Sequence, residues 1–369
     1  MEKQTKYNMV KEKVMEWITT GQVLPGDKIY PESELVRMFR VSRHTVRLAI
    51  GDLVHEGWLF REKGVGTFCT HQTMNNHTEF NNPTTKSIGV ITTYISDYFF
   101  PLIIRGIESY LSDRGYSLIL ACTYNNIDKE KQCLESMLNR NIDGLIVEPT
   151  KSSNYNPNIN YYLEFENKNI PYLMINQYYP QLFPPHFIVN DEKGGFIATD
   201  HLIELGHERI IGIFNTDDLQ GVYRMKGFIR ALRNNNITFS TEMILTISTE
   251  DETNILKDKI RKFILSLKTV PTGIVCYNDQ LAITVLNILR DSKIRVPEDI
   301  SIVGYDDTNL AVATDVKLTS VSHPKMNMGI EVAKWIVAAV ENKLKSRNTP
   351  ESIIYEPELI IRNSTKSLK

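Results

Sequence analysis

Hydrophobic and polar residues follow two different patterns along the chain. Up to residue 70, apolar residues recur every three or four positions, which predicts helices over residues 7–18, 32–39 and 43–56. From residue 87 onward, short apolar runs alternate with stretches of helical spacing such as residues 223–234; the runs include SIGVIT at 87–92, GLIV at 144–147 and YLMI at 172–175. Such runs are typical of buried parallel strands, so the two regions are expected to fold differently.

The first region has the order of elements of a helix-turn-helix. Residues 40–41 make a tight turn between two short helices, and Ser42 is a good N-cap for the second helix. Arg43, His44 and Arg47 lie in the first turns of that second helix. The same end of a recognition helix enters the major groove, where its side chains can reach base edges.

A β-hairpin wing is predicted directly after this helix, over residues 58–68. Gly64 and Gly66 lie at its turn, where glycine lets backbone N–H groups approach a phosphate or a minor groove closely. Lys63 adds positive charge at the tip. The alternative is that these basic residues only form a solvated surface, but the correct order of turn, basic helix and wing favours DNA binding.

The second region alternates strands and helices in two series, which predicts an α/β body with two doubly wound lobes and parallel sheets. Ligands bind outside the carboxyl ends of the strands in such sheets. Residues 71–86 are polar, rich in Asn and Thr, and almost without apolar periodicity, as linkers are. We therefore expect a DNA-binding domain over 1–70, a linker over 71–86 and a two-lobed body over 87–369.

Composition narrows the possible functions further. The 369 residues carry a net charge of −2, which excludes a wholly basic nucleic-acid binder, although residues 1–70 hold eleven Lys+Arg against nine Asp+Glu. The chain has no run of about 18 apolar residues and no apolar segment near its start, so neither a membrane helix nor a signal peptide is expected. Four scattered cysteines without C-x-x-C indicate reduced thiols in a cytoplasm rather than disulfides or a zinc site.

The first region resembles the GntR family of bacterial regulators. The matching strings are PESEL at 31–35, VSRHTVRLAI at 41–50 and GVGTF at 64–68. In that family the start of the recognition helix and the wing touch DNA. The resemblance therefore implies these DNA contacts: Arg43, His44, Thr45, Arg47, Lys63, Gly64 and Gly66.

The body resembles the LacI/GalR repressors and their periplasmic binding-protein relatives. The strongest matching strings are HLIELGHERIIGIF at 201–214, YRMKGF at 223–228 and VPEDISIVGYDD at 296–307. The segment SSNYNPNINYYL at 152–163 departs from the family pattern, and the sequence assigns it no role. The resemblance implies an effector site between the lobes and a homodimer.

Polar residues beside the predicted strands are the candidate effector contacts. Asn278 can donate and accept hydrogen bonds at once, and Asp306 can accept two sugar hydroxyls. Arg224 stands where the family uses an arginine as a bidentate clamp. An aromatic ring after the first strand would stack on the apolar face of a sugar. The candidates are Tyr98, Asn176, Arg224, Asn278, Asp306 and His323.

Each of these candidates also has a purely structural interpretation. Asp306 and its neighbour Asp307 could cap the next helix, and Arg224 could form a surface salt bridge. Phe99 and Phe100 are more often core residues than stacking platforms. The set as a whole, with carboxylate, amide, guanidinium and aromatic groups, favours a neutral ligand rich in hydroxyls.

A GntR-type head on a LacI-type body resembles the arabinose-responsive repressors of Gram-positive bacteria. This resemblance implies a repressor that leaves double-stranded operator DNA when L-arabinose binds; a regulator of another sugar or metabolite is the alternative. An enzyme is disfavoured, because no Walker A, HExxH, G-x-S-x-G or complete G-x-G-x-x-G motif occurs. A periplasmic sugar-binding protein is disfavoured by the head. We expect no catalytic residues, metal or cofactor, and no membrane partner.

Overall fold

The structure, a computed structural model, divides the chain into two compact units, Met1–Asn82 and Pro83–Lys369. The predicted linker falls largely outside the residues that the structure describes, so its bounds stay a prediction. The described residues are 6–24, 26–55, 58–62, 65–70, 85–95, 99–240, 242–250, 253–267, 270–341 and 352–369.

The first unit is a small winged helix-turn-helix. Its elements are α1 (Lys6–Thr19), α2 (Glu32–Phe39), α3 (Arg43–His55), β1 (Leu59–Glu62) and β2 (Gly66–Cys69). The helices pack on a core that includes Val10, Val46 and Leu53, each fully buried. The two strands pair antiparallel, with Leu59 opposite Cys69. The predicted helix-turn-helix and wing are therefore confirmed.

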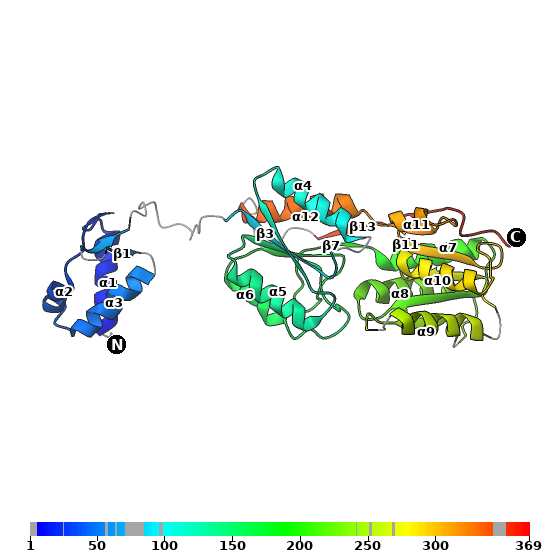
Figure 1. Cartoon of the computed structure of the whole chain (residues 1–369), viewed down its shortest axis with the longest axis horizontal. Helices are drawn as coiled ribbons and strands as arrows, with labels where there is room; N and C mark the ends of the chain where they lie inside the picture. The colour runs from blue at the N-terminus through cyan, green and yellow to red at the C-terminus, as the bar shows by residue number, and fades with distance from the viewer. Residues whose placement is uncertain are drawn as a thin grey trace. The chain divides into compact units, whose positions relative to one another are not determined.

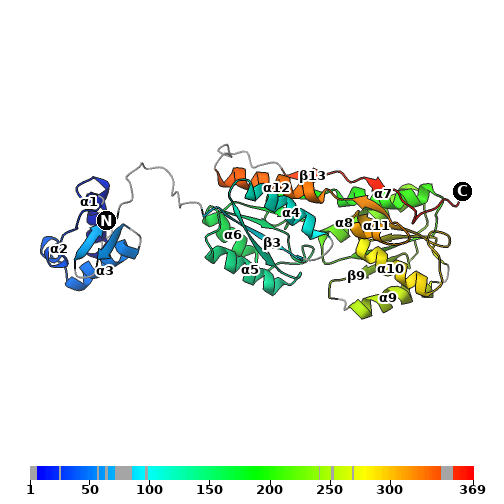
Figure 2. The same ribbon diagram turned by 45° about the horizontal axis from the view of Figure 1, so that its top comes forward.

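The first lobe of the body is a parallel sheet covered by helices on both faces. Its strands run in the order β13-β7-β6-β5-β3-β4. Helices α4 and α12 cover one face, and α5 and α6 the other (Figures 1 and 2). The bounds are β3 (Ser87–Thr92), α4 (Phe100–Ser112), β4 (Ser117–Cys122), α5 (Ile127–Asn139), β5 (Gly144–Val147), α6 (Ile159–Asn167), β6 (Tyr172–Ile175), β7 (His186–Val189), α12 (Lys325–Val340) and β13 (Ile353–Tyr355).

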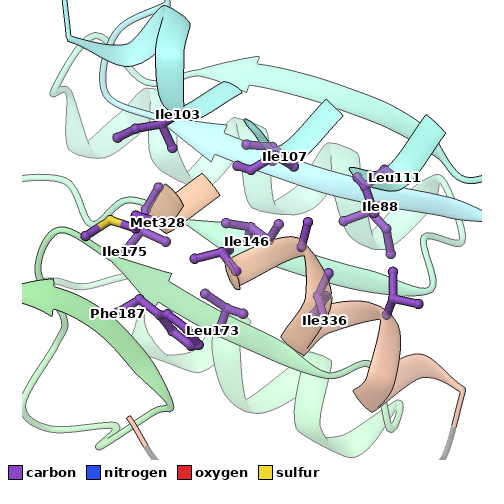
Figure 3. Packing of buried hydrophobic residues seen from close by; sticks show 14 of the residues in the cluster. Ile88, Ile103, Ile107, Leu111, Ile146, Leu173, Ile175, Phe187, Met328 and Ile336 are labelled. Carbon is purple, nitrogen blue, oxygen red and sulfur yellow. The ribbon is translucent and has the colours of Figure 1, made fainter. Parts of the chain in front are cut away.

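Strand β3 shows why the apolar run predicts a strand that is buried on both faces. Ile88 packs with α4 and α12, as Figure 3 shows, whereas Ile91 packs with α5 and α6 on the opposite face. Burying each of these isoleucine side chains stabilises the folded state by about 1.5–3 kcal/mol. Helices α4 and α12 approach closely because Gly329 has no Cβ, which would overlap with the carbonyl oxygen of Ile103.

The second lobe repeats this architecture. Its strands run in the order β14-β12-β11-β10-β8-β9, and β14 alone among them pairs antiparallel. Helices α7 and α8 cover one face, and α9, α10 and α11 the other. The bounds are α7 (Asp191–Glu204), β8 (Ile210–Asn215), α8 (Leu219–Asn234), β9 (Ile244–Ile247), α9 (Thr253–Ser266), β10 (Gly273–Cys276), α10 (Asp279–Asp291), β11 (Ser301–Asp306), α11 (Asn309–Ala313), β12 (Thr319–Ser322) and β14 (Leu359–Ile360).

Both sheets reverse their strand order at one point, between β3 and β5 in the first lobe and between β8 and β10 in the second. Ligands bind at such points, outside the carboxyl ends of the strands. The chain crosses between the lobes three times, after β7, after β12 and between β13 and β14. The α/β fold with two doubly wound lobes is thus confirmed.

The four cysteines carry free thiols, and Cys69 and Cys276 are buried while Cys122 and Cys133 are half-buried. Burial raises the pKa of the Cys276 thiol, and the nearby carboxylate of Asp279 raises it further. Within the parts of the chain that the structure describes, no helix combines the length and the apolar character needed to cross a membrane.

Candidate DNA-binding surface and effector cleft

The start of α3 is fixed by a local cap. The hydroxyl of Ser42 accepts a hydrogen bond from the backbone N–H of Thr45 at 3.1 Å, as predicted for an N-cap. The side chains of Arg43 and Arg47 are 71% and 60% exposed, and His44 is exposed beside them. Three predicted DNA contacts therefore extend into solvent at the helix end that would enter a groove.

The carboxylate of Glu32 on α2 lies close to three basic side chains of this surface. Glu32 lies 3.3 Å from Arg47, 3.8 Å from Arg43 and 3.9 Å from Arg61 of β1. Pairs between exposed arginines and a half-buried carboxylate contribute about 0–1 kcal/mol each, so the three arginines could exchange Glu32 for another anion at small cost. The sequence alone leaves open whether Arg61 contacts DNA or is only a surface residue opposite Glu62, and Glu32 is not among the predicted contacts.

The wing is described only in part. Gly66 has φ of 154°, and a Cβ there would overlap with the side chain of Lys28. The side-chain nitrogen of Lys28 lies 6.0 Å from the ring centroid of Phe68 in β2. Lys28 is therefore a basic residue beside the wing. Lys63 and Gly64, both predicted DNA contacts, lie outside the described residues.

A cavity of about 330 Å³ opens between the two lobes of the body. Polar residues from the carboxyl ends of strands in both lobes border it, as the reversal of strand order predicts. These strand-end residues include Thr93 after β3, Glu148 after β5, Gln177 after β6, Asn215 in β8, Asn278 after β10 and Asp306 at the end of β11.

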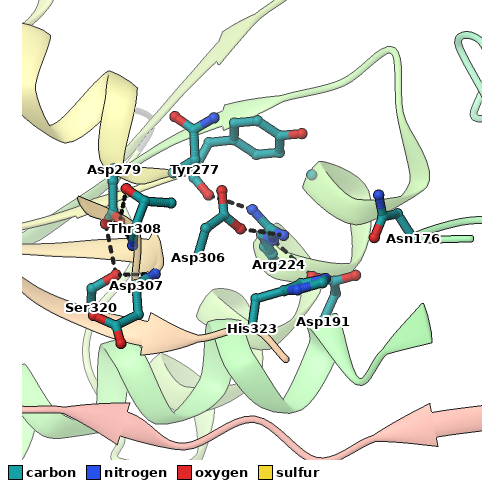
Figure 4. Close-up of polar contacts among 12 residues, drawn as sticks. Asn176, Asp191, Arg224, Tyr277, Asp279, Asp306, Asp307, Thr308, Ser320 and His323 are labelled. Carbon is teal, nitrogen blue, oxygen red and sulfur yellow. Dashed lines mark hydrogen bonds and ion pairs between the residues drawn. The ribbon is translucent and has the colours of Figure 1, made fainter. Parts of the chain in front are cut away.

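Arg224 lies at the centre of a buried ionic network in the cavity wall (Figure 4). Its guanidinium group donates to Asp191 at 2.8 Å and to Asp306 at 3.4 Å. It also donates to the carbonyl oxygen of Tyr277 at 2.7 Å and lies 3.5 Å from the ring centroid of Tyr305. Its side chain is 2% exposed, so the alternative of a surface salt bridge does not apply.

Asp306 and Asn278 both border the cavity. Asp306 ends β11 with φ of 91°, a conformation that Asp and Asn tolerate better than most residues. Its neighbour Asp307 pairs with Arg362 at 2.6 Å and does not border the cavity. Asn278 also caps α10 by accepting the N–H of Leu281 at 2.9 Å, so its structural role coexists with its place in the cavity wall.

Glu148 is a cavity residue that the sequence analysis missed. Its carboxylate accepts hydrogen bonds from the N–H of Thr93 at 2.9 Å, from the hydroxyl of Thr93 at 2.5 Å and from Asn176 at 2.9 Å. Burial raises the pKa of Glu148 to about 7, despite these hydrogen bonds. Asn176 lies behind Glu148 and does not border the cavity itself. The missed signal is that Glu148 directly follows the GLIV strand.

His323 lies next to the cavity residue Phe99 but does not reach the cavity itself. Its ring lies 4.6 Å from that of Phe99 in an edge-on contact, and Phe99 and Phe100 both border the cavity. His323 does not border it, and neither ring nitrogen has a hydrogen-bond partner among the described residues. Burial lowers the pKa of His323 well below its usual range. Tyr98 lies outside the described residues.

The charges in the cavity wall disfavour an anionic ligand. Among the described residues, three carboxyl groups, those of Glu148, Asp218 and Asp306, border the cavity against the one guanidinium group of Arg224, which is already paired. Asp218 accepts from Asn215 at 2.7 Å and from the hydroxyl of Tyr277 at 2.8 Å. Carboxylates and amides beside aromatic rings suit a neutral ligand with several hydroxyl groups.

Both parts of the chain match known families. Residues 6–69 match the bacterial regulatory proteins of the gntR family, and residues 199–365 match the periplasmic binding protein-like domain. The LacI family transcriptional regulator of Enterococcus faecium, solved with bound ribose, is 26% identical. The match covers 77% of this chain and 100% of that one, with a TM-score of 0.64. The two resemblances found in the sequence are thereby confirmed.

Two relatives match over almost the entire chain. The arabinose metabolism transcriptional repressor of Halalkalibacterium halodurans is 49% identical over 99% of this chain and 98% of its own length. The protein of the same name from Geobacillus stearothermophilus is 47% identical over 98% of both. Both matches thus cover the DNA-binding domain as well as the body. The chain therefore belongs to the family of the arabinose metabolism transcriptional repressors.

Proposed function

We propose that this protein is a transcriptional repressor that binds operator DNA as a homodimer and releases it when L-arabinose binds between the lobes of the body. The observation that carries the proposal is the identity of 49% and 47% with two arabinose metabolism repressors over the full architecture. The hydroxyl-binding groups in the cavity wall support a sugar as effector. The relatives are regulators, so we propose no catalytic activity, and we place the protein in the cytoplasm.

The proposed mechanism links sugar binding in the cavity to operator binding by the DNA-binding domains. Arg224, Asn278 and Asp306 of the second lobe, with Glu148 and Gln177 of the first, would contact one sugar from both sides. A ligand held by both lobes favours their closed arrangement, which is a hinge motion. Operator DNA must then bind another arrangement better, so that sugar and DNA weaken each other's binding.

Replacing Asp306 with asparagine is expected to weaken the response to sugar. Asn keeps the shape of the side chain and tolerates the positive φ, but it loses the charged acceptor for sugar hydroxyls. We expect the L-arabinose concentration for half-maximal operator release to rise about 10- to 100-fold. Fluorescence anisotropy of labelled operator, with D-xylose and D-glucose as comparison sugars, measures this concentration.

The adjacent variant Asp307→Asn is the matched control, because Asp307 pairs with Arg362 outside the cavity wall. It should respond to L-arabinose like the wild type, and both variants should bind operator without sugar within about twofold of the wild type. An unchanged response of Asp306→Asn would refute the assigned role of Asp306. A wild type that no sugar releases would refute the proposed function.

Replacing Arg43 with alanine is expected to lower affinity for the operator about 10- to 100-fold, the loss of one bidentate contact to a base. The loss on random DNA should be much smaller, because phosphate contacts carry that affinity. Competition titrations at fixed salt measure both affinities. Arg37→Ala on α2 is the control, because Arg37 is exposed and is not one of the arginines that lie near Glu32. It should not change the ratio of operator affinity to random-DNA affinity. Equal losses for Arg43→Ala on the two DNAs would contradict base readout.

A further inference from the structure

Two serines of the segment that departs from the family pattern connect the two lobes directly. The hydroxyl of Ser152 accepts the backbone N–H of Leu219 at 2.9 Å and donates to the side-chain oxygen of Gln177. The hydroxyl of Ser153 donates to the carbonyl oxygen of Thr216 at 2.6 Å. Leu219 and Thr216 belong to the second lobe. We call Ser152, Ser153 and their partners the interlobe clasp.

Two side-chain contacts flank the clasp and join the same two lobes. The amide of Asn125 donates to the hydroxyl of Thr249 at 3.0 Å, and Lys151 pairs with Glu250 at 2.5 Å. Asn125 also accepts the N–H of Lys151 at 2.9 Å, so the two contacts support each other. Asn125 and Thr249 themselves border the cavity, whereas Ser153 and the pair of Lys151 with Glu250 lie outside its lining.

A buried carboxylate holds the clasp segment in place on the first lobe. Glu130 of α5 is fully buried and accepts hydrogen bonds from four neutral donors. The donors are Asn156 at 2.8 Å, Asn158 at 2.9 Å, Tyr162 at 2.9 Å and Tyr179 at 2.6 Å. Such complete satisfaction is what a buried polar group requires, and it rigidifies the groups that provide it. These hydrogen bonds therefore fix the segment that follows Ser152 and Ser153 to the first lobe.

The clasp also touches both walls of the effector cavity. Gln177, which accepts from Ser152, borders the cavity from the first lobe. Leu219 is the first residue of α8, the helix that carries Arg224 in the opposite wall. A shift of Ser152 would therefore act on Gln177 in one wall and on the start of the helix that carries Arg224 in the other.

Resting on the proposed function, we propose that Ser152 and Ser153 are positioning residues for effector binding. The clasp holds the lobes at the separation at which both walls reach one sugar, and so sets the sugar concentration to which the repressor responds. The apparent dissociation constant equals the intrinsic constant divided by the fraction of molecules in the binding-competent arrangement. Weakening the clasp lowers that fraction without removing any group from the cavity wall.

Ser153 provides the test, because it is half-buried and does not border the cavity. In the full chain, Ser153→Ala should raise the L-arabinose concentration for half-maximal operator release about five- to tenfold, the effect of one hydrogen bond. Ser153→Thr keeps the hydroxyl and should restore the response to within about twofold. Tyr155→Ala changes an 82% exposed residue of the same segment and should have no effect.

Hydrogen exchange without sugar gives an independent measure of the clasp. Peptides covering residues 150–155 and 216–220 should exchange faster in Ser153→Ala than in the wild type, while Ser153→Thr and Tyr155→Ala match the wild type. Unchanged exchange in Ser153→Ala would overturn the clasp itself, and faster exchange with an unchanged sugar response would overturn its positioning role. A wild type insensitive to every sugar would instead overturn the proposed function, and the exchange data would still decide whether the clasp exists.

Discussion

Replacing Arg224 with methionine is expected to lower the free energy of unfolding of the body by about 3–5 kcal/mol. Methionine fills much of the same volume, so the loss comes from the ionic network rather than from an empty space. Without the guanidinium group, Asp191 and Asp306 would face each other as buried carboxyls with no cation between them. Burial already raises the pKa of Asp191 to about 6, against the lowering effect of Arg224.

Urea unfolding of the full chain, followed by circular dichroism, measures this loss. Arg230→Met is the matched control on the same helix, because Arg230 is 46% exposed and pairs with Glu192 at the surface. The control should lose less than about 1 kcal/mol. A loss of similar size in the two variants would show that the buried network does not stabilise the body. Arg224→Met should also abolish the response to L-arabinose, since it removes the cation from the cavity wall.

Most of the fold was predictable because its strands are apolar runs buried on both faces. GLIV at 144–147 and YLMI at 172–175 coincide with β5 and β6. Strand β9 and helix α6 were missed, because ILTI is only partly buried and the helix α6 lies in an Asn- and Tyr-rich stretch. Helix α8 begins at Leu219, before the predicted start at 223, because Asp218 caps it by accepting the N–H of Gly221.

The site was predictable where a strand end marks a residue, as for Asn278 and Asp306, or where the family resemblance does, as for Arg224. Arg224, Asn278 and Asp306 border the cavity. Position after a strand does not tell which of two successive side chains faces the ligand, because neighbouring residues point in opposite directions. Asn176 was therefore predicted, whereas its neighbour Gln177 borders the cavity. The contacts of the clasp that cross between the lobes join segments more than sixty residues apart, such as Ser152 and Leu219, and no local pattern encodes them.

Glu148 is expected to destabilise the folded body progressively as the pH rises from 4.5 to 8. Its pKa lies at about 7 in the folded body because of burial, above the ordinary value of 4.5. Between these values the folded body keeps a proton that the unfolded chain has released, so raising the pH through this interval removes stability. The group contributes roughly 3 kcal/mol below pH 4.5 and almost nothing above pH 8. Burial likewise raises the pKa of Asp279 to about 7, which adds a loss of the same sign.

The variant Glu148→Gln isolates this contribution, because glutamine has similar shape and no titrating proton. The free energy of unfolding of Glu148→Gln minus that of the wild type should increase by roughly 3 kcal/mol from pH 4.5 to pH 8. Urea unfolding of the full chain at several pH values gives this difference. Glu164→Gln, a 47% exposed carboxylate on α6, serves as the control and should give a difference constant within about 0.5 kcal/mol. A difference for Glu148→Gln that stays flat, or that decreases with pH, would mean that the folded body holds Glu148 ionised throughout, with the hydrogen bonds from Thr93 and Asn176 outweighing its burial.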